Sequence, residues 1–262
     1  VAVPLLGGHH GANALARRCA EILGGSAAIT TAGDVSLGLA LDQPPRGWRV
    51  GNGAAAKPIT AALLAGAPVD LAIEAAAEDC DWLRQAAFTE IDSAQRTHPS
   101  PLPPPARGGG KTFKLLPRVV VSDRAIAGDD KTLVLHPATL AIGIGCERGA
   151  SLAEVAALVA QCLNRAQLSR QSVAGVFSIA LKAAEPAIHE IAGKFGVPAR
   201  FFDAARLLAE TPRLTERSDI VFRETGCWGV AEGAALAAAG PDAELAVAKQ
   251  RSARATCAIA RS

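Results

Sequence analysis

The chain has 262 residues, half of them hydrophobic, which is enough for two ordinary domains with buried cores. Its 27 Lys and Arg residues barely exceed its 25 Asp and Glu residues, and no basic run is interleaved with aromatics, which argues against nucleic acid as a partner. No apolar stretch reaches the ~20 residues of a membrane span and no leader pattern is present, so we expect a cytoplasmic protein that binds no membrane.

Cysteine and methionine usage adds two expectations. The six cysteines are widely spread and never form a C-x-x-C pair, which argues against a disulfide framework and against a zinc site. Methionine is absent even from position 1, and the chain begins directly in an apolar run. We interpret this as an N-terminally truncated piece of a longer protein.

Residues 1–71 have the pattern of part of an α/β domain, in which strands and helices alternate. Gly24 and Gly25 follow the first helical pattern as a stop signal. The expected elements are strands at 1–6 and 27–31 and helices at 14–23 and 59–65.

Residues 72–139 are expected to form a variable central region and linker. The stretch "THPSPLPPPARGGGK" contains five prolines and three consecutive glycines, which prevent a regular element. Two runs rich in β-branched and other apolar residues, 114–123 and 131–137, are candidate strands.

Residues 140–262 give the clearest pattern, that of a second layered α/β domain. Ser151 and Glu154 have the spacing of a capping box, Pro186 suits the first turn of a helix that Gly196 ends, and Asp203 can cap another helix. Expected strands are 140–145, 175–182, 198–202, the start of 219–240, 244–249 and 254–261, and expected helices are 151–163, 186–194, 204–209 and the end of 219–240. The predicted fold class is therefore α/β, with two layered α/β domains joined by a variable central linker.

Three glycine turns stand where a strand meets a helix, at 7–13, 145–149 and 226–229. Free backbone N–H groups at such places attract anions. None of the three fits G-x-G-x-x-G or the P-loop spacing, so dinucleotide and P-loop interpretations fail.

The first turn contains His9 and His10. Adjacent histidines point in different directions and do not chelate one metal as an i,i+4 pair does, so no protein metal site is expected. One of them is placed to act as an acid, a base or a hydrogen-bond donor, and the alternative is one packed and one solvated turn residue. Asn13 either caps the helix or lies in the same cleft. Thr30, Thr31 and Asp34, at the next strand end, either line that cleft or form only a turn.

The second turn contains Cys146 and Arg148. A thiol at a helix N-terminus can have a lowered pKa, but no histidine pairs with it in the sequence, so nucleophilic catalysis is not favoured. The planar fork of Arg148 suits a carboxylate. Ser178, Lys182 and Glu185 follow a buried strand, and Lys182 with Glu185 has the spacing of an ion pair.

Six motifs in fixed order carry a family resemblance. They are "PLLGGHHGANALARRCAEILGGSAAITTAGD", "IGIGCERGAS", "IALKAAEP", "ARFFDAARL", "TGCWGVAEGAAL" and "AKQRSARATCAIAR". Together they resemble the cobalt-precorrin-5A hydrolase family of cobalamin biosynthesis. The C-terminal domain of that family is in turn similar to a stand-alone protein of the aerobic pathway.

The resemblance implies a reaction and its partners. The reaction is hydrolysis of the δ-lactone of cobalt-precorrin-5A, which gives cobalt-precorrin-5B and releases acetaldehyde. Cobalt arrives inside the substrate, so no cofactor is implied. The implied partners are a cobalt-corrin or precorrin intermediate and a fused or neighbouring precorrin methyltransferase. The alternative is a non-catalytic binder or carrier of corrin intermediates. Family members usually carry a further N-terminal stretch, and we expect that this sequence lacks it.

A corrin intermediate is a large apolar ring fringed with carboxylates, which suits a cleft between α/β domains rimmed by glycine turns. We expect general acid–base catalysis on water with His9 or His10 as base and turn amides stabilising the oxyanion. The substrate-binding candidates are Gly7, Gly8, Gly11, Asn13, Thr30, Thr31, Asp34, Cys146, Arg148, Ser178, Lys182 and Glu185.

Overall fold

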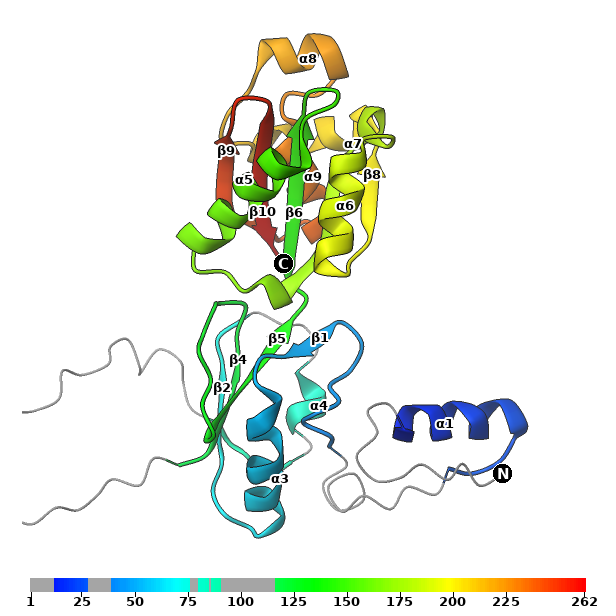
Figure 1. Ribbon diagram of the computed structural model, residues 1–262, viewed down its shortest axis with the longest axis vertical. Helices are drawn as coiled ribbons and strands as arrows, with labels where there is room; N and C mark the ends of the chain where they lie inside the picture. The colour runs from blue at the N-terminus through cyan, green and yellow to red at the C-terminus, as the bar shows by residue number, and fades with distance from the viewer. Residues whose placement is uncertain (1–11, 28–38, 76–79, 85, 91–115) are drawn as a thin grey trace, which may run out of the picture.

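The computed structural model describes residues 12–27, 39–75, 80–84, 86–90 and 116–262, and these contain two five-stranded sheets (Figure 1). The expected strand at 1–6, and most of the one at 27–31, lie outside the described residues. No described helix is long and apolar enough to cross a membrane.

The predicted N-terminal helix is confirmed as α1, Ala12–Leu23. Gly24 follows in the left-handed conformation (φ 63°), and the Gly25 N–H donates to the Ala20 carbonyl at 2.9 Å, which ends the helix as the glycine pair predicts. Leu15, Ile22 and Leu23 are exposed, so the described residues leave the apolar face of α1 uncovered.

The first sheet, which we call the central sheet, has the strand order β1-β5-β4-β2-β3. All neighbours are parallel except β1, which runs antiparallel to β5. Buried side chains such as Ile59, Leu71 and Leu133 join the helices to the sheet in one apolar core. The elements are β1 (Trp48–Val50), η1 (Gly53–Ala55), α3 (Ala56–Leu64), β2 (Asp70–Ile73), α4 (Asp81–Arg84), β3 (Thr89–Glu90), β4 (Arg118–Val121) and β5 (Thr132–Pro137).

Three sequence predictions are confirmed here, namely the helix at 59–65 and the strands within 114–123 and at 131–137. The linker prediction is wrong where the structure describes regular elements, because β2 continues to Ile73 and α4 and β3 follow. These elements are only two to four residues long, too short for a periodic pattern, and the two strands are held by parallel pairing. The strand β2 also crosses residue 71, where the sequence placed a boundary. The proline-rich stretch lies outside the described residues.

The second sheet, the C-terminal sheet, has the order β8-β7-β6-β10-β9. The strands β6, β7 and β8 are parallel, and β10 is antiparallel to both β6 and β9. The elements are β6 (Leu140–Cys146), α5 (Leu152–Arg165), η3 (Arg170–Ser172), β7 (Val173–Ile179), η4 (Ala180–Lys182), α6 (Pro186–Phe195), β8 (Ala199–Phe202), α7 (Ala204–Ala209), η5 (Thr211–Arg213), α8 (Asp219–Thr225), α9 (Val230–Ala239), β9 (Glu244–Arg251) and β10 (Ala255–Arg261).

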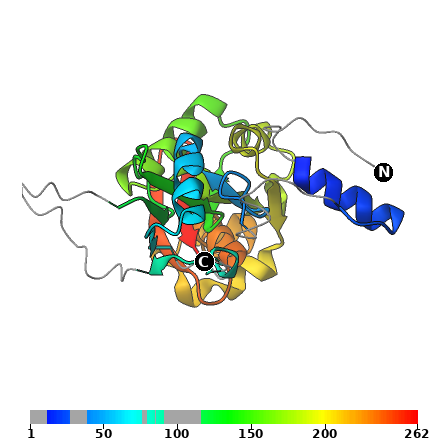
Figure 2. The same ribbon diagram turned by 90° about the horizontal axis from the view of Figure 1, so that it is seen from below.

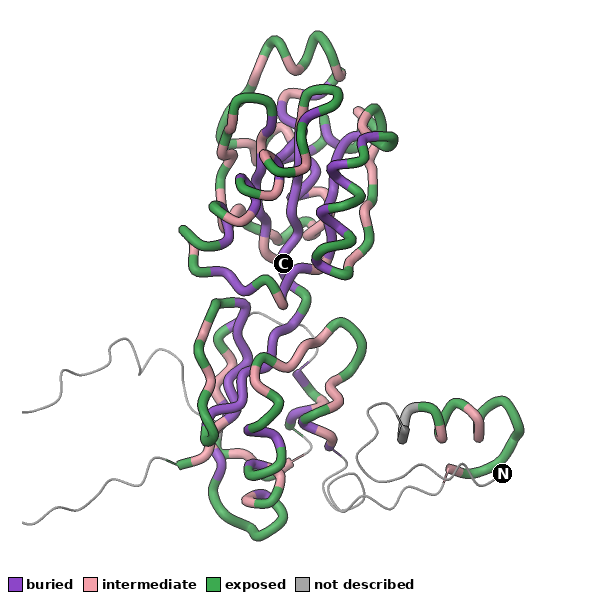
Figure 3. Tube along the Cα trace, viewed as in Figure 1, coloured by how far each residue is buried: buried purple, intermediate pink, exposed green. Residues whose placement is uncertain are grey.

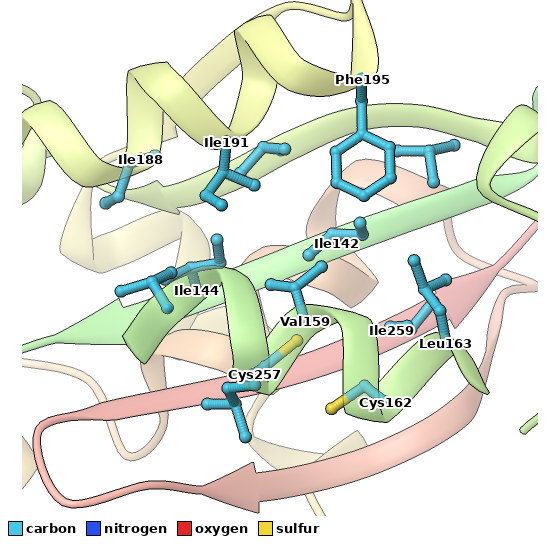
Figure 4. Close-up of a cluster of buried hydrophobic side chains, with 14 of the residues drawn as sticks. Ile142, Ile144, Val159, Cys162, Leu163, Ile188, Ile191, Phe195, Cys257 and Ile259 are labelled. Atoms are coloured by element: carbon cyan, nitrogen blue, oxygen red, sulfur yellow. The ribbon is translucent and has the colours of Figure 1, made fainter. Parts of the chain in front are cut away.

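Helices cover both faces of this sheet. Ile142 and Ile144 of β6 point to one face, where α5 and α6 supply Val159, Leu163 and Ile188 (Figure 4). The alternate β6 residues face α7 and α9, and the carbonyl of Ala231 in α9 lies only 1.9 Å from the position of a side chain at Gly143. Burial on both faces explains why β6 is a continuous apolar run.

Most predictions for this half are confirmed, including the caps. Ser151 Oγ accepts from Glu154 N at 3.2 Å, Asp203 Oδ1 accepts from Arg206 N at 2.7 Å, and Gly196 ends α6 with a φ of 64°. The strand predicted at the start of 219–240 is wrong, because Asp219–Thr225 is the helix α8. Ser218 caps that helix and Gly226 ends it, and these end signals outweigh the β-branched pair Ile220-Val221.

The central sheet contacts the end of the C-terminal sheet at which β6 begins (Figures 1 and 2). Arg49 of β1 donates to the Phe195 carbonyl at 2.8 Å, and Arg261 of β10 forms a bidentate pair with Asp123, which follows β4. The residues that join β5 to β6 are buried except for Ala138 (Figure 3). The other end of the C-terminal sheet, where β6 and β7 finish and α8 lies, therefore faces away from the central sheet.

Candidate functional site

A cavity of about 580 Å³ opens where β6 and β7 end. This is the carboxyl end of the parallel strands, where α/β folds collect ligands. Its wall is built from the β6–α5 turn, the last residues of β7 and η4, the helix α8, the start of α9 and the β9–β10 hairpin. The lining residues are Gly145, Cys146, Glu147, Arg148, Ile179, Lys182, Ser218, Val221, Glu224, Thr225, Trp228, Gly229, Val230, Ala231, Lys249, Arg251, Ser252, Ala253, Arg254, Ala255 and Thr256.

Positive charge predominates in the wall. The cationic side chains are Arg148, Lys182, Lys249, Arg251 and Arg254, and the anionic ones are Glu147 and Glu224. Two further carboxylates, Glu185 and Glu216, pair with wall cations and reduce the excess of three positive charges to one. Among the described residues, no carboxylate pairs with Arg148, which leaves its guanidinium available to an anionic ligand.

Arg254 of the hairpin fixes the β6–α5 turn. Its guanidinium donates to the carbonyl of Arg148 at 3.0 Å and to the Glu147 carboxylate at 3.0 Å. The Glu147 N–H returns a bond to the Arg254 carbonyl at 2.9 Å. The backbone that carries Arg148 is thus held by the neighbouring β9–β10 hairpin.

Glu154 of α5 holds the hairpin in turn. Its carboxylate accepts from Ser252 Oγ at 2.6 Å and from Arg254 N at 2.7 Å. These bonds, that of Ser252 above all, lower the pKa of Glu154 below its ordinary value because they favour the charged form. The side chain therefore binds a segment about one hundred positions away and does not complete the capping box.

Lys182 and Glu185 form the ion pair that their spacing predicts, with Nζ and Oε1 3.6 Å apart. The other carboxylate oxygen of Glu185 accepts from Gly149 N at 3.1 Å, at the left-handed glycine (φ 68°) of the β6–α5 turn. Glu185 thus supports the turn from behind the wall, and Lys182 lines the cavity.

Cys146 ends β6 and is half-buried in the wall. Burial raises the pKa of its thiol above the ordinary value, and the nearby Lys182 offsets only part of this effect. The thiol therefore stays protonated at neutral pH, which fits a wall residue and disfavours a nucleophile.

The structure separates the predicted site residues into three groups. Cys146, Arg148 and Lys182 line one cavity, and Glu185 lies directly behind them. Ser178 is fully buried and donates to the Ile144 carbonyl at 2.6 Å, so we no longer retain it as a substrate-binding candidate. Asn13 lies within α1 and not at its N-cap. The remaining candidates lie outside the described residues; they are His9, His10, Gly7, Gly8, Gly11, Thr30, Thr31 and Asp34.

The sequence missed the other half of the wall. Trp228 and the hairpin residues Lys249, Arg251 and Arg254 were not singled out, although the turn at 226–229 was noted as a place where ligands gather. The run "AKQRSARAT" has three cations in nine residues, which was the available signal. Among the described residues, no group of His, Cys, Asp and Glu side chains is arranged to hold a metal ion.

Fold and cavity together define an α/β protein whose candidate site is a cavity with an excess of cationic side chains. Comparison with family models identifies the family to which this chain belongs. Residues 140–260 match the family model described as Cobalamin synthesis G C-terminus, residues 44–137 match Cobalamin biosynthesis central region, and residues 1–34 match Cobalamin synthesis G N-terminal. The chain belongs to the cobalamin synthesis G family.

Two relatives and two solved structures are similar. Protein CobE of Sinorhizobium sp is 50% identical over 47% of this chain and 80% of its own. The cobalt-precorrin-5A hydrolase of Priestia megaterium is 28% identical over 98% of this chain and 68% of its own. A crystal structure of CobE aligns with 38% identity and a TM-score of 0.46 over 48% of this chain and 92% of its own. A crystal structure of a putative cobalamin biosynthesis protein G homolog from Sulfolobus solfataricus aligns with 24% identity and a TM-score of 0.41. The alignment covers 98% of this chain and 69% of that protein's chain.

Proposed function

We propose that this chain is a cobalt-precorrin-5A hydrolase of cobalamin biosynthesis. The observation that carries the proposal is the 28% identity to a hydrolase of that name over 98% of the chain, across all three family regions. The reaction is hydrolysis of the substrate δ-lactone, followed by release of the two-carbon bridge as acetaldehyde. Cobalt belongs to the substrate.

The cavity supports this substrate class. A corrin intermediate is fringed with acetate and propionate carboxylates. The wall offers Lys182, Lys249 and Arg251 together with Arg148, which no carboxylate of the described residues pairs with. We assign these cations to the carboxylate fringe, because charge-assisted bonds to carboxylates are the strongest that such side chains make. The wall thus recognises an anion although the whole chain has a formal net charge of only +2.

For the chemical step we propose His9 or His10 as general base, which takes a proton from the attacking water. Imidazole has the pKa that suits a base at neutral pH. The described cavity contributes binding groups, and its one half-buried thiol, Cys146, is held protonated. Binding and proton transfer are therefore assigned to different regions of the chain.

Location and partners complete the proposal. Cys146, Cys162, Cys227 and Cys257 of the C-terminal domain are thiols, which fits a reducing compartment, and we propose the cytoplasm. A fused or neighbouring precorrin methyltransferase would supply the methylated precursor.

The test is anaerobic incubation of the full chain with cobalt-precorrin-5A. Acetaldehyde is measured by coupled alcohol dehydrogenase and NADH, and the corrinoid product by mass spectrometry. We expect stoichiometric acetaldehyde, and a loss of at least about 100-fold in kcat when both His9 and His10 are replaced by Gln. Tight binding of substrate without acetaldehyde would replace the hydrolase by the carrier.

Binding is separated from catalysis by a second variant. Arg148→Gln should raise KM about tenfold with kcat little changed, because the contact to a distant carboxylate is the same in substrate and transition state. Arg200→Gln is the matched control, since Arg200 is exposed on the edge strand β8 and does not line the cavity. Equal KM values for the two variants would remove Arg148 from the site.

A further inference from the structure

One feature of the cavity wall is aromatic and is not explained by carboxylate binding. Trp228 lines the cavity between α8 and α9, half-buried. Its ring stacks on that of Phe222, with centroids 4.3 Å apart and planes 19° from parallel. Phe222 itself does not line the cavity, so it supports Trp228 from outside.

The backbone around Trp228 is fixed at several points. Cys227 is fully buried beside it, Gly226 takes the left-handed conformation (φ 77°) that ends α8, and the Trp228 carbonyl accepts from Ser218 N at 3.1 Å. An indole held by a stacked ring and an anchored backbone loses little conformational entropy when a ligand binds.

The helix α8 carries exposed apolar side chains next to Trp228 in the sequence. Ile220 is 62% exposed and Phe222 is 36% exposed, and both are on α8 (Figure 1). Val221 of the same helix lines the cavity. Trp228 and Val221 therefore give an apolar part to the cavity that Arg148 also lines.

We propose that Trp228 determines specificity by packing its indole against the conjugated face of a flat, tetrapyrrole-derived ring, whose carboxylate fringe reaches the cations of the wall. This inference rests on the proposed function for the class of substrate. Cations alone accept many polyanions, and an aromatic surface beside them selects a planar conjugated one, because offset stacking adds to apolar burial.

Two corrins with one ring and different fringes test the proposal. Cobyrinic acid carries carboxylates around the ring, and cobinamide carries amides in their place. Binding of both to the full chain is measured by calorimetry. Trp228→Ala should raise Kd about tenfold for both probes, and Trp228→Phe by less than about threefold, because Phe keeps an aromatic face.

Other variants separate stacking from charge and from simple burial. Arg148→Gln should weaken cobyrinic acid alone, and Trp228→Leu, which stays apolar, should weaken both probes nearly as much as Trp228→Ala. Arg200→Gln should change neither Kd. The proposal is overturned if Trp228→Ala binds both probes as the wild type does, or if Trp228→Leu restores wild-type binding of both.

Failure of this proposal differs from failure of the proposed function. If the wild type releases acetaldehyde while Trp228→Ala and Trp228→Leu, folded by circular dichroism, keep its KM and its Kd values, the stacking role is wrong and the hydrolase stands. If binding of both corrins depends on Trp228 but the wild type releases no acetaldehyde from cobalt-precorrin-5A, the stacking role stands and the hydrolase is wrong.

Discussion

Gly143 is the position at which packing and ligand binding meet. A side chain there would place Cβ 1.9 Å from the Ala231 carbonyl oxygen and 2.8 Å from Ala235 N, both backbone atoms of α9. A separation of 3.0 Å, below which Cβ contacts essentially never occur, requires the helix to move by about 1.1 Å. Backbone inside a packed layer cannot rotate away as a side chain can, so we expect Gly143→Ala to displace the start of α9.

Overpacking of this kind destabilises by typically ~1–3 kcal/mol, and the backbone clash places Gly143→Ala at the upper end, about 3 kcal/mol. Because Ala231 also lines the cavity, corrin affinity should fall together with stability. Guanidinium denaturation followed by circular dichroism measures the loss, and hydrogen exchange of the β6 amides assigns it to the C-terminal sheet.

Gly193→Ala is the matched control. A Cβ at Gly193, inside α6, meets nothing within 4 Å, so alanine should stabilise the chain by ~0.5–1 kcal/mol through its higher helix propensity. Wild-type stability and wild-type corrin affinity in Gly143→Ala would refute the reasoning, because α9 would then not be held against β6 as described.

Three further predictions concern single groups. Burial lowers the pKa of His136 below its ordinary 6.5, so the unfolded chain takes up that proton more readily and stability falls as pH drops through about 6.5; His136→Gln should flatten this part of the stability curve between pH 7.5 and 5. Cys146→Ser should keep at least about half the wild-type kcat, and alkylation of Cys146, followed by mass spectrometry, should require a higher pH than a free thiol does, because its pKa is raised. Asp123→Asn should lower the free energy of unfolding by about 2 kcal/mol in urea, since Arg261 loses a bidentate partner, and an unchanged midpoint would contradict this.

Local signals predicted the C-terminal sheet well. The caps at Ser151 and Asp203 and the glycine at 196 act within one turn of their own helix, so their effect can be predicted from neighbouring residues alone. The helix α8 lies where the sequence predicts a strand: the adjacent β-branched residues Ile220 and Val221 favour a strand, and the cap at Ser218 favours a helix.

Pairing between distant segments could not be predicted. The strand β2 has four residues and is defined by its partners, not by its own pattern. Glu154 was expected to bond its own helix end and instead binds Ser252 in the hairpin. The residues of the second glycine turn predicted a ligand site, which stays a prediction, but the rest of the cavity wall, with Trp228 and Arg254, comes from distant segments that only the fold brings together.

The most direct test of the hydrolase is an oxygen-labelling experiment with the full chain and cobalt-precorrin-5A in H₂¹⁸O under anaerobic conditions. Hydrolysis of the lactone at its carbonyl predicts one ¹⁸O in the new carboxylate of the corrinoid product for each molecule of acetaldehyde released. Substrate that is bound and recovered unlabelled, with no acetaldehyde formed, would contradict the account and leave a binding protein.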